Sequence, residues 1–182
     1  MHYLDPRSRM SSVFADLTID SGARQPSVPP GVPPTVVAYA QAFLKTARDS
    51  LRFLWRDDER WLAVHLIRKS YGTESNRSSS FRNSTSVPDR VSLRVAEIDL
   101  PRGITVREVD VLTLLALGLT NVGIAERLGT SARTVSTQIE RLLTKLDQNT
   151  RGGLSALAVD SGLLRLPIPG GVIGGQESES SN

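Results

Sequence analysis

The sequence predicts a mainly α-helical protein: a C-terminal four-helix bundle of helix-turn-helix type, a small α+β N-terminal fragment with one helix and a β-hairpin, and disordered arms. Two observations predict this class. Helix-capping residues divide the segment 103–166 into four short helices joined by brief turns. Prolines and serines crowd the segments outside the two folded parts, and apolar residues make up only 39% of the 182 residues.

Composition excludes several kinds of functional site. The chain has no cysteine, which rules out disulfides, thiolate metal ligands and a cysteine nucleophile. The 2 histidines, His2 and His65, stand in no spacing typical of a zinc site, so we expect no metal, no cofactor and no enzymatic activity. No apolar run approaches the roughly 18 residues of a membrane span, and no signal peptide is present, so we expect a cytoplasmic protein.

The charge balance permits a nucleic-acid partner without requiring one. The formal net charge is +3, with 22 basic and 19 acidic side chains. Nearly all of the basic side chains are arginines, whose codons are GC-rich, and this indicates a bacterial source. Net charge therefore does not identify the function, and the sequence motifs have to be considered.

The N-terminal half reads as an arm followed by a small fragment. Residues 1–34 hold repeated prolines, which block regular structure, and predict a disordered arm with one short element near Val13–Ile19. Residues 35–49 follow a helical pattern that Thr35 can cap. Two aromatic and β-branched runs within 51–69 flank a charged turn and predict a β-hairpin. A helix and one hairpin enclose no ligand pocket, so we interpret residues 35–70 as the remnant of a sensor domain.

Serine and glycine mark the segments on either side of the helical domain. Residues 71–102 are Ser-rich and predict a flexible linker, in which residues 91–100 form a strand or an extended lead-in. Residues 167–182 are rich in glycine and serine and predict a disordered tail. The domain between these segments spans residues 103–166.

Capping signals place the four helices of that domain. Thr105 and Glu108 form a capping box for the first helix, which runs to about Leu117 and ends before Gly118. The remaining three helices and their caps are 121–128 between Thr120 and Gly129, 132–146 after Ser131, and 151–161 between Thr150 and Gly162. The second and third helices are separated by the spacing of a helix-turn-helix, which makes the third helix the reading element.

The third helix has one apolar side and one polar side. At 100° per residue, Val135, Ile139, Leu142 and Leu146 fall together and predict the core face. The opposite side carries short polar side chains and two arginines: Arg133, Ser136, Thr137, Glu140, Arg141 and Thr144. Such a face suits the DNA major groove, because short residues allow close approach and arginines reach phosphates or guanine edges. A plainly solvated surface is the competing interpretation.

Residues 103–164 resemble the LuxR/GerE-type helix-turn-helix family. The resemblance rests on the run Ile104-Thr-Val-Arg-Glu-Val-Asp-Val-Leu-Thr-Leu-Leu-Ala-Leu-Gly-Leu-Thr-Asn121, on Ile124-Ala-Glu-Arg-Leu-Gly-Thr-Ser-Ala-Arg-Thr-Val135, and on Lys145-Leu146 with Arg151 after a short gap. It implies a transcription regulator that binds double-stranded DNA, usually as a homodimer through the fourth helix, with an N-terminal regulatory region. RNA polymerase is a further candidate partner.

The resemblance also implies roles for single residues. Arg107 and Glu108 would hold the first helix in place. The DNA contacts would come from the start and outer face of the third helix, with Thr134 at phosphate, Ser136, Thr137 and Glu140 at bases, and Lys145 near the backbone. The full predicted DNA-binding set is Ser131, Arg133, Thr134, Ser136, Thr137, Glu140, Arg141 and Lys145.

Departures from the family pattern keep two alternatives open. Ser136 and Glu140 occupy places where relatives often carry Lys or Arg, and Gln138 replaces a frequent His. Residues 102–165 carry a charge of only +2, which predicts weak non-specific DNA affinity. The alternatives are a sigma-factor region-4-like module and a protein-interaction module that keeps the fold but has lost DNA affinity.

The first helix of the domain carries a second apolar stripe opposite its core stripe. Val106, Val109, Thr113 and Leu117 project to this side. The stripe predicts either a docking face for another subunit or for the N-terminal segment, or partial burial under the linker.

Overall fold

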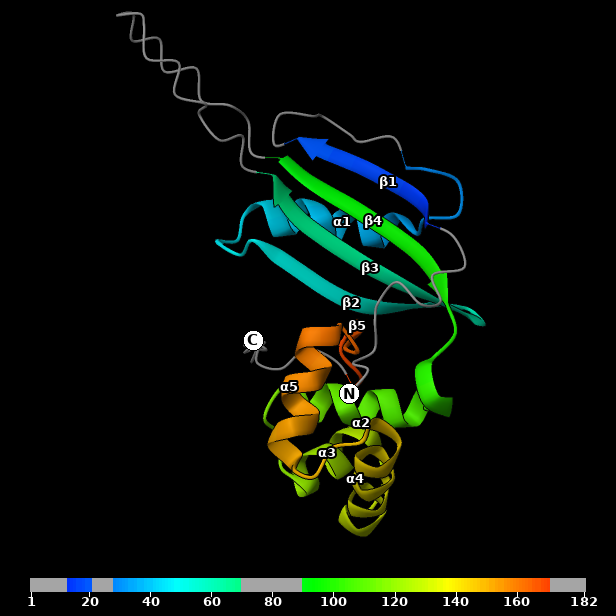
Figure 1. The fold of residues 1–182 in the computed structure, drawn as a ribbon, viewed down its shortest axis with the longest axis vertical. Coiled ribbons are helices and arrows are strands. Elements are labelled where there is room, and N and C mark those ends of the chain that lie inside the picture. The colour runs from blue at the N-terminus through cyan, green and yellow to red at the C-terminus, as the bar shows by residue number, and fades with distance from the viewer. Residues whose placement is uncertain (1–12, 21–27, 70–89, 171–182) are drawn as a thin grey trace, which may run out of the picture. The chain divides into compact units, whose positions relative to one another are not determined.

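A computed structural model describes residues 13–20, 28–69 and 90–170 (Figure 1). The chain divides into two compact units. The first comprises Met1–Arg52 and Asp57–Ile98, and the second comprises Phe53–Arg56 and Asp99–Asn182. The Ser-rich part of the predicted linker and most of the predicted N-terminal arm lie outside the described residues.

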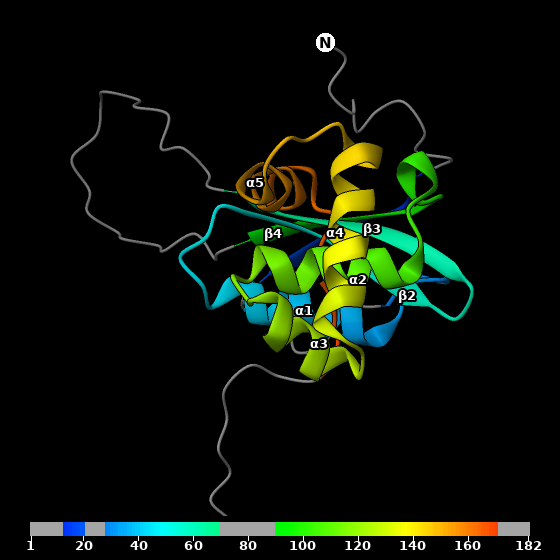
Figure 2. The same cartoon turned by 90° about the horizontal axis from the view of Figure 1, so that it is seen from below.

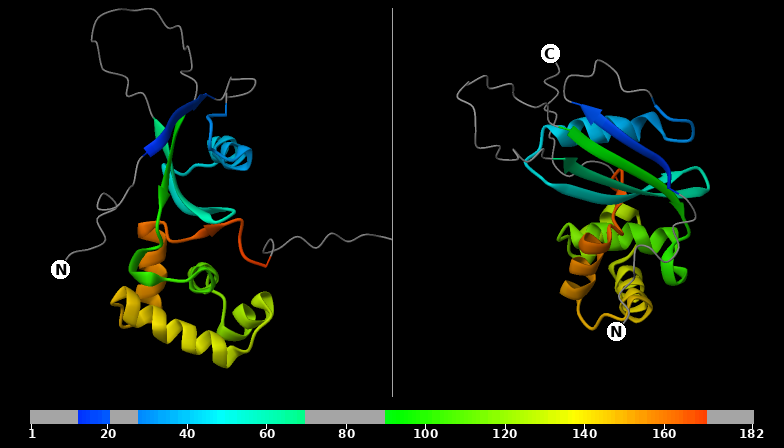
Figure 3. Two further views of the ribbon diagram at one scale, coloured as in Figure 1. Left: turned by 90° about the vertical axis from the view of Figure 1, so that its right-hand side faces the viewer. Right: turned by 45° about the horizontal axis from the view of Figure 1, so that its top comes forward.

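The first unit is an antiparallel sheet with one helix against one face (Figure 3). Its strands run in the order β1-β4-β3-β2, and β4 pairs antiparallel with both β1 and β3. Strands β2 and β3 form the hairpin that the sequence predicts. The elements are β1 (Val13–Asp20), α1 (Pro34–Leu44), β2 (Ser50–Asp57), β3 (Arg60–Lys69) and β4 (Arg90–Ile98). Within β2, Phe53–Arg56 belong to the second unit.

Helix α1 is shorter than the predicted 35–49, and Thr35 does not cap it. Its N-cap is Pro33, which makes no side-chain cap bond, and the fixed φ of Pro34 suits the first helical position. At the other end, the Arg68 guanidinium lies 5.9 Å from the Phe43 ring centroid and donates to the carbonyl oxygen of Phe43 at 3.4 Å. The helix ends at Leu44, before the predicted Asp49, and Lys45 is its C-cap.

The sheet corrects the prediction of a mainly helical chain. Strand β1 lies within the segment predicted as a disordered arm, and β4 lies within the segment predicted as a linker. The sequence predicts a short element near β1 and a strand or extended lead-in at β4, but not the sheet that joins them. In β4, Val91, Leu93 and Val95 alternate with Ser92 and Arg94, but Ser92 is buried as well, so the pattern of apolar and polar residues is only partial. Its partner β1 lies about seventy residues earlier in the chain, beyond the reach of a local pattern.

The second unit is a bundle of four short helices (Figure 2). Its helices agree closely with the predicted boundaries: α2 (Val106–Ala116), α3 (Asn121–Leu128), α4 (Ala132–Leu146) and α5 (Arg151–Ser161). A 3-10 turn, η1 (Pro101–Gly103), precedes them and a short strand, β5 (Arg165–Leu166), follows them. Strand β5 pairs in parallel register with Leu54 and Trp55, which belong to this unit.

The predicted caps of these helices are confirmed. Thr105 and Glu108 form the capping box of α2. The side chains of Thr120, Ser131 and Thr150 accept the backbone N–H that caps α3, α4 and α5. Gly129 and Gly162 end α3 and α5 in the left-handed conformation, with φ of 61° and 72°. The positions of the capping residues therefore define where these helices begin and end.

The second apolar stripe on α2 is largely buried rather than a docking face. Val109 and Thr113 are 0% and 2% exposed, and only Leu117 at the helix end is open at 45%. The chain after α5 turns back over this side, where the backbone N–H of Arg165 donates to the Thr113 hydroxyl at 2.9 Å. The predicted disordered tail also starts too early, because Pro169 is buried and the structure describes residues through Gly170.

The described segments contain neither a membrane-spanning helix nor a cluster of metal ligands. No helix there combines the length and apolar character that crossing a bilayer demands. No group of three histidine or carboxylate side chains gathers there as a metal site would.

Candidate nucleic-acid interface

The start of α4 presents two hydroxyl groups at an exposed helix N-terminus. The Ser131 hydroxyl accepts the backbone N–H of Thr134 at 3.1 Å, and the two side-chain oxygens lie 2.9 Å apart. Both residues are exposed. Backbone amides and the helix dipole make such a terminus favourable for a phosphate. The assignment of these two residues to DNA remains a prediction with suitable geometry.

The buried side of α4 fixes which residues face outward. Val135, Ile139, Leu142 and Leu146 are between 0% and 8% exposed, and they are the four residues predicted for the core. On the other side, five of the predicted polar residues are exposed: Arg133, Thr137, Glu140, Arg141 and Thr144. Side-chain burial therefore gives this helix one orientation, with its hydrophilic face open.

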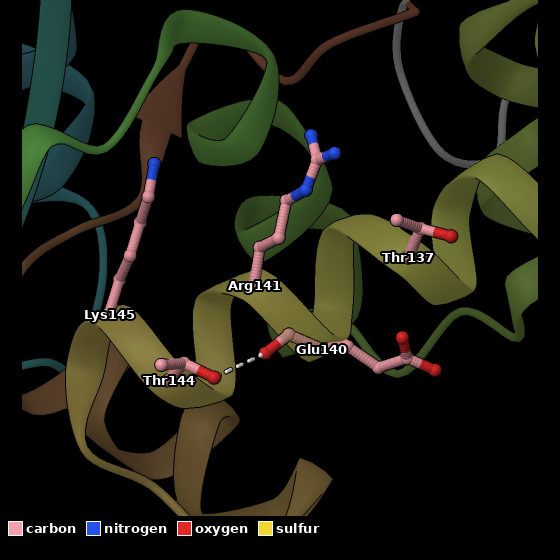
Figure 4. A pocket seen from close by; sticks show the side chains of 5 residues that line it. All are labelled: Thr137, Glu140, Arg141, Thr144 and Lys145. Atoms are coloured by element: carbon pink, nitrogen blue, oxygen red, sulfur yellow. Dashed lines mark hydrogen bonds between the residues drawn. The ribbon is translucent and has the colours of Figure 1, made fainter.

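The open face of α4 carries two guanidinium groups and one carboxylate without partners. Among the described residues, the side chains of Arg133, Arg141 and Glu140 make no hydrogen bond or ion pair. A shallow depression runs along this face, lined by Thr137, Glu140, Arg141, Thr144 and Lys145 (Figure 4). Figure 4 shows Arg141 and Lys145 extending from the same side of the helix, while Glu140 extends from another.

The two threonines of this face use their hydroxyl protons within the helix. Thr137 donates to the carbonyl oxygen of Arg133 and Thr144 donates to that of Glu140, both at 3.2 Å. Each hydroxyl oxygen keeps acceptor capacity, and each methyl group stays available for an apolar contact. A thymine methyl or a cytosine amino group is the kind of base edge that such side chains match.

Ser136 makes two hydrogen bonds inside the domain, and its role at bases stays a prediction. Its hydroxyl donates to the carbonyl oxygen of Ala132 at 3.1 Å and accepts from the Asn121 amide at 2.9 Å. The Asn121 carbonyl oxygen accepts in turn from Arg151 at 2.8 Å. With its one proton and one lone pair used, Ser136 joins α4 to α3 and α5 instead of standing open on the outer face.

Lys145 is likewise held by the protein itself. Its ammonium group lies 2.7 Å from the Glu108 carboxylate and 2.7 Å from the carbonyl oxygen of Gly103. Burial raises the pKa of Glu108, but hydrogen bonds from Lys145 and Thr105 outweigh this effect and hold its pKa below the usual range. The predicted role of Glu108 in fixing the first helix fits this geometry. Lys145 fastens α4 to α2.

Three residues hold the helices in position through bonds that the sequence did not predict. Asn121 and Arg151 form the link to Ser136, and the Arg151 guanidinium also donates to the carbonyl oxygen of Leu119. Arg107 donates to the carbonyl oxygen of Leu128 at 2.5 Å, which ties α2 to the end of α3. Asn121 stands at the first position of α3, and asparagine side chains often form hydrogen bonds at helix ends. This position was the one sign in the sequence of the link to Ser136.

His65, which stands in no spacing typical of a zinc site, belongs to the first unit. It is partly buried in β3, and its Nε2 accepts from the Arg52 Nε at 3.4 Å. Burial, together with the nearby charges of Arg52 and Arg94, lowers the pKa of His65 below its ordinary value. A neutral imidazole at neutral pH suits a strand of an antiparallel sheet.

The helical unit matches a known family. Residues 103–158 match the family described as "Bacterial regulatory proteins, luxR family". The Transcriptional activator protein ExaE of Pseudomonas putida is 40% identical over 65 residues. That match covers 36% of this chain and 30% of the relative, so the chain corresponds to less than a third of the relative's length.

Solved structures of VqmA share a weaker likeness. The Vibrio cholerae VqmA dimer in the absence of target DNA matches with a TM-score of 0.35 and 20% identity, over 70% of this chain and 61% of that chain. The VqmA-ligand-DNA complex matches with a TM-score of 0.34 and 19% identity, over 71% and 62%. These values are too low to establish a shared arrangement of the two units.

Taken together, the confirmed caps of α2 to α5, the orientation of α4 and the match over residues 103–158 give one conclusion. Residues 103–158 form a helix-turn-helix domain that is similar to the luxR family of bacterial regulatory proteins.

Proposed function

We propose that the chain is a sequence-specific DNA-binding transcription regulator of LuxR type in the cytoplasm, with α4 entering the major groove. The observation that carries this proposal is the outward face of α4, where Arg133 and Arg141 have no partner among the described residues. An unpaired guanidinium group on an open helix is ready to pair with phosphate or guanine without first breaking an internal bond. RNA polymerase is a second proposed partner, through which such a regulator would act.

The proposed contacts divide between backbone and bases. Ser131 and Thr134 at the helix start bind a phosphate through backbone amides and hydroxyls. Arg133 and Arg141 neutralise phosphates or read guanine. Thr137 and Glu140 face bases, where Glu140 accepts a hydrogen bond from a cytosine amino group. Lys145 and Ser136 hold the helix in place through their bonds to Glu108 and Asn121.

We propose a homodimer that pairs through α5. Its exposed side shows Gly152, Ala156 and Val159, which are spaced by four and then three residues and so share one stripe. Val159 is 57% exposed, unusual for a large apolar side chain. Small residues at the first two positions allow two copies of the helix to approach closely. Two domains joined this way would reach half-sites about one DNA turn apart.

One observation favours a second candidate, a protein-interaction module of the same fold. Glu140 is an exposed carboxylate beside Arg141 in the chain, and Lys145 is paired with Glu108. Phosphate repels an unpaired carboxylate, so a face with this composition also suits a partner protein with a basic surface.

The test is selection of binding sites from random DNA by the full chain, followed by a salt titration on the selected site. We expect a shared sequence to emerge and the affinity to fall steeply with salt concentration. Arg133→Ala should weaken binding, while the matched variant Arg60→Ala, which removes a charge from the β2–β3 hairpin, should leave it unchanged. Binding that shows no enriched sequence and little salt dependence would favour the protein-interaction module.

A further inference from the structure

The chain does not leave the helical domain when α5 ends. After Gly162, residues 163–170 turn back along the bundle, and we name this segment the C-terminal strap. Its first bond is a backbone one, from the N–H of Leu163 to the carbonyl oxygen of Ala158 at 2.9 Å. Leu163 and Pro169 are both buried. The strap lies beyond residue 158, where the match to the luxR family stops.

The strap is bound to α2 through Arg165. Its backbone N–H donates to the Thr113 hydroxyl at 2.9 Å, and its guanidinium pairs with the Asp110 carboxylate at 2.5 Å. The Asp110 side chain is only 11% exposed. A carboxylate this deeply buried requires its cation, because removing one partner of a buried pair leaves an uncompensated charge.

The far end of the strap is bound to α3. The Arg127 Nε donates to the carbonyl oxygen of Pro169 at 3.1 Å. Gly170, with a φ of 76°, lies directly against Arg127: a Cβ atom there would stand 2.7 Å from the Arg127 carbonyl oxygen and 2.5 Å from its Cγ. Only glycine fits this approach.

Helix α3 needs support of this kind. It has eight residues, with Gly123 inside it, and both its shortness and the glycine weaken a helix. Its only two buried side chains are Ile124 and Ala125. Arg107 holds its last turn from α2, and the strap holds Arg127 in the same turn from another direction.

We propose that the C-terminal strap locks α3 onto α2 and thereby sets the position from which the helix-turn-helix pair presents α4. The inference that the strap controls DNA affinity rests on the proposed function. The inference that it controls the local stability of α3 does not.

The experiment compares Gly170→Ala with Gly103→Ala in the full chain. Both glycines have a positive φ, 76° and 64°, but a Cβ at Gly103 meets nothing within 4 Å. Both variants therefore carry the backbone strain, and only Gly170→Ala displaces the strap. A second pair removes one negative charge each: Asp110→Asn weakens the anchor of Arg165, whereas Glu126→Gln alters an exposed side chain of α3.

Three readouts are measured under conditions where circular dichroism shows each variant folded. They are the rate at which trypsin cuts after Arg165, the hydrogen exchange of the backbone amides of α3, and the affinity for DNA. We expect Gly170→Ala and Asp110→Asn to speed both cleavage and α3 exchange by about tenfold, because local opening sets both rates. Their DNA affinity should fall, while Glu126→Gln, which lowers the negative charge near DNA, should raise it slightly.

The outcomes separate the two proposals. If Gly170→Ala speeds cleavage after Arg165 but the amides of α3 exchange as in the unaltered chain, the strap proposal is overturned. This holds whether or not the affinity for DNA changes. If α3 exchange responds as expected and the unaltered chain binds no DNA, the lock stands and the proposed function falls. A fall in DNA affinity for Asp110→Asn with a rise for Glu126→Gln supports both.

Discussion

The arginines of the sheet and those on the open face of α4 have opposite surroundings. In the first unit, Arg90 pairs with Asp20 at 2.8 Å and Arg94 with Asp16 at 3.2 Å, so cations on β4 face anions on β1. On α4, Arg133 and Arg141 have no such partner within the described residues. Acidic neighbours neutralise Arg90 and Arg94, whereas no acidic side chain among the described residues neutralises Arg133 or Arg141.

This difference shows that pairing, more than net charge, distinguishes a surface suited to an anionic partner. The exposed cross-strand pairs stabilise the sheet by at most about 1 kcal/mol each. The guanidinium groups of these pairs are nevertheless bound to carboxylates and are not open to another anion. The same distinction applies within the helical unit, where Lys145 is bound to Glu108 while Arg141, one turn earlier on α4, is open.

The largest expected effect is that of removing both open arginines of α4. The double variant Arg133→Ala/Arg141→Ala should bind the selected DNA about 100-fold more weakly, since each guanidinium contact is worth about 1–3 kcal/mol. The control is Arg90→Ala/Arg94→Ala, which removes the same charge from the sheet and should change affinity by less than about twofold. Fluorescence anisotropy at one salt concentration measures both. Equal losses from the two double variants would show that net charge alone governs binding.

Removing the occupied cation should instead affect folding. Lys145→Met leaves the Glu108 carboxylate buried without its partner, and should lower the free energy of unfolding by about 2 kcal/mol. Urea denaturation followed by circular dichroism measures this loss. The salt dependence of DNA binding should keep its slope, whereas Arg133→Ala should reduce that slope by about 1. A reduced slope for Lys145→Met would mean that its ammonium group reaches phosphate.

Local signals in the sequence predicted the helical unit because they act over a few residues. The Thr105–Glu108 capping box and the left-handed glycines Gly129 and Gly162 lie within one turn of the helix ends that they define. The apolar spacing of α4 likewise fixed its core face. These signals were enough for helix boundaries and for the orientation of the candidate site.

Pairings between distant residues were beyond such signals. The bond from Ser92 to Asp16 spans 76 positions, and the pair of Lys145 with Glu108 spans 37. No periodicity links residues so far apart, so a short element near β1 and a strand or extended lead-in at β4 were predicted without the pairing that makes them one sheet. For the same reason the internal partners of Lys145 and Ser136 were not predicted, and the role of these two residues at DNA stays a prediction.

A smaller effect is expected from Glu140, the one open carboxylate on the face of α4. Glu140→Lys replaces a charge that phosphate repels with one that it attracts, and should strengthen non-specific binding by about tenfold. Glu140→Gln should give a smaller gain on most sequences, but a loss on any site where Glu140 accepts from cytosine. Anisotropy titrations against the selected site and a scrambled site measure both. Weaker binding of Glu140→Lys to both sites would show that this face does not meet DNA.

The smallest effect expected is on the pH dependence of stability, and it compares the two units directly. The pKa of His65 is lowered from 6.5 by burial and by Arg52 and Arg94, so the unfolded chain binds its proton more readily. Its contribution is complete above pH 6.5 and declines as the pH falls below that value. The pKa of Glu108 is lowered from 4.5, so its contribution declines only as the pH falls through 4.5 and below.

Urea denaturation at a series of pH values should therefore show two successive losses. His65→Gln should remove the loss that begins near pH 6.5 and leave the more acidic one. Glu108→Gln should lower stability at neutral pH, because Lys145 loses its partner, and should remove the loss that begins near pH 4.5. A first loss that persists in His65→Gln would assign it to another group. In that case His65 would not account for the loss of stability near pH 6.5, and Glu108 would be the one group of the two with an assigned acid-induced loss.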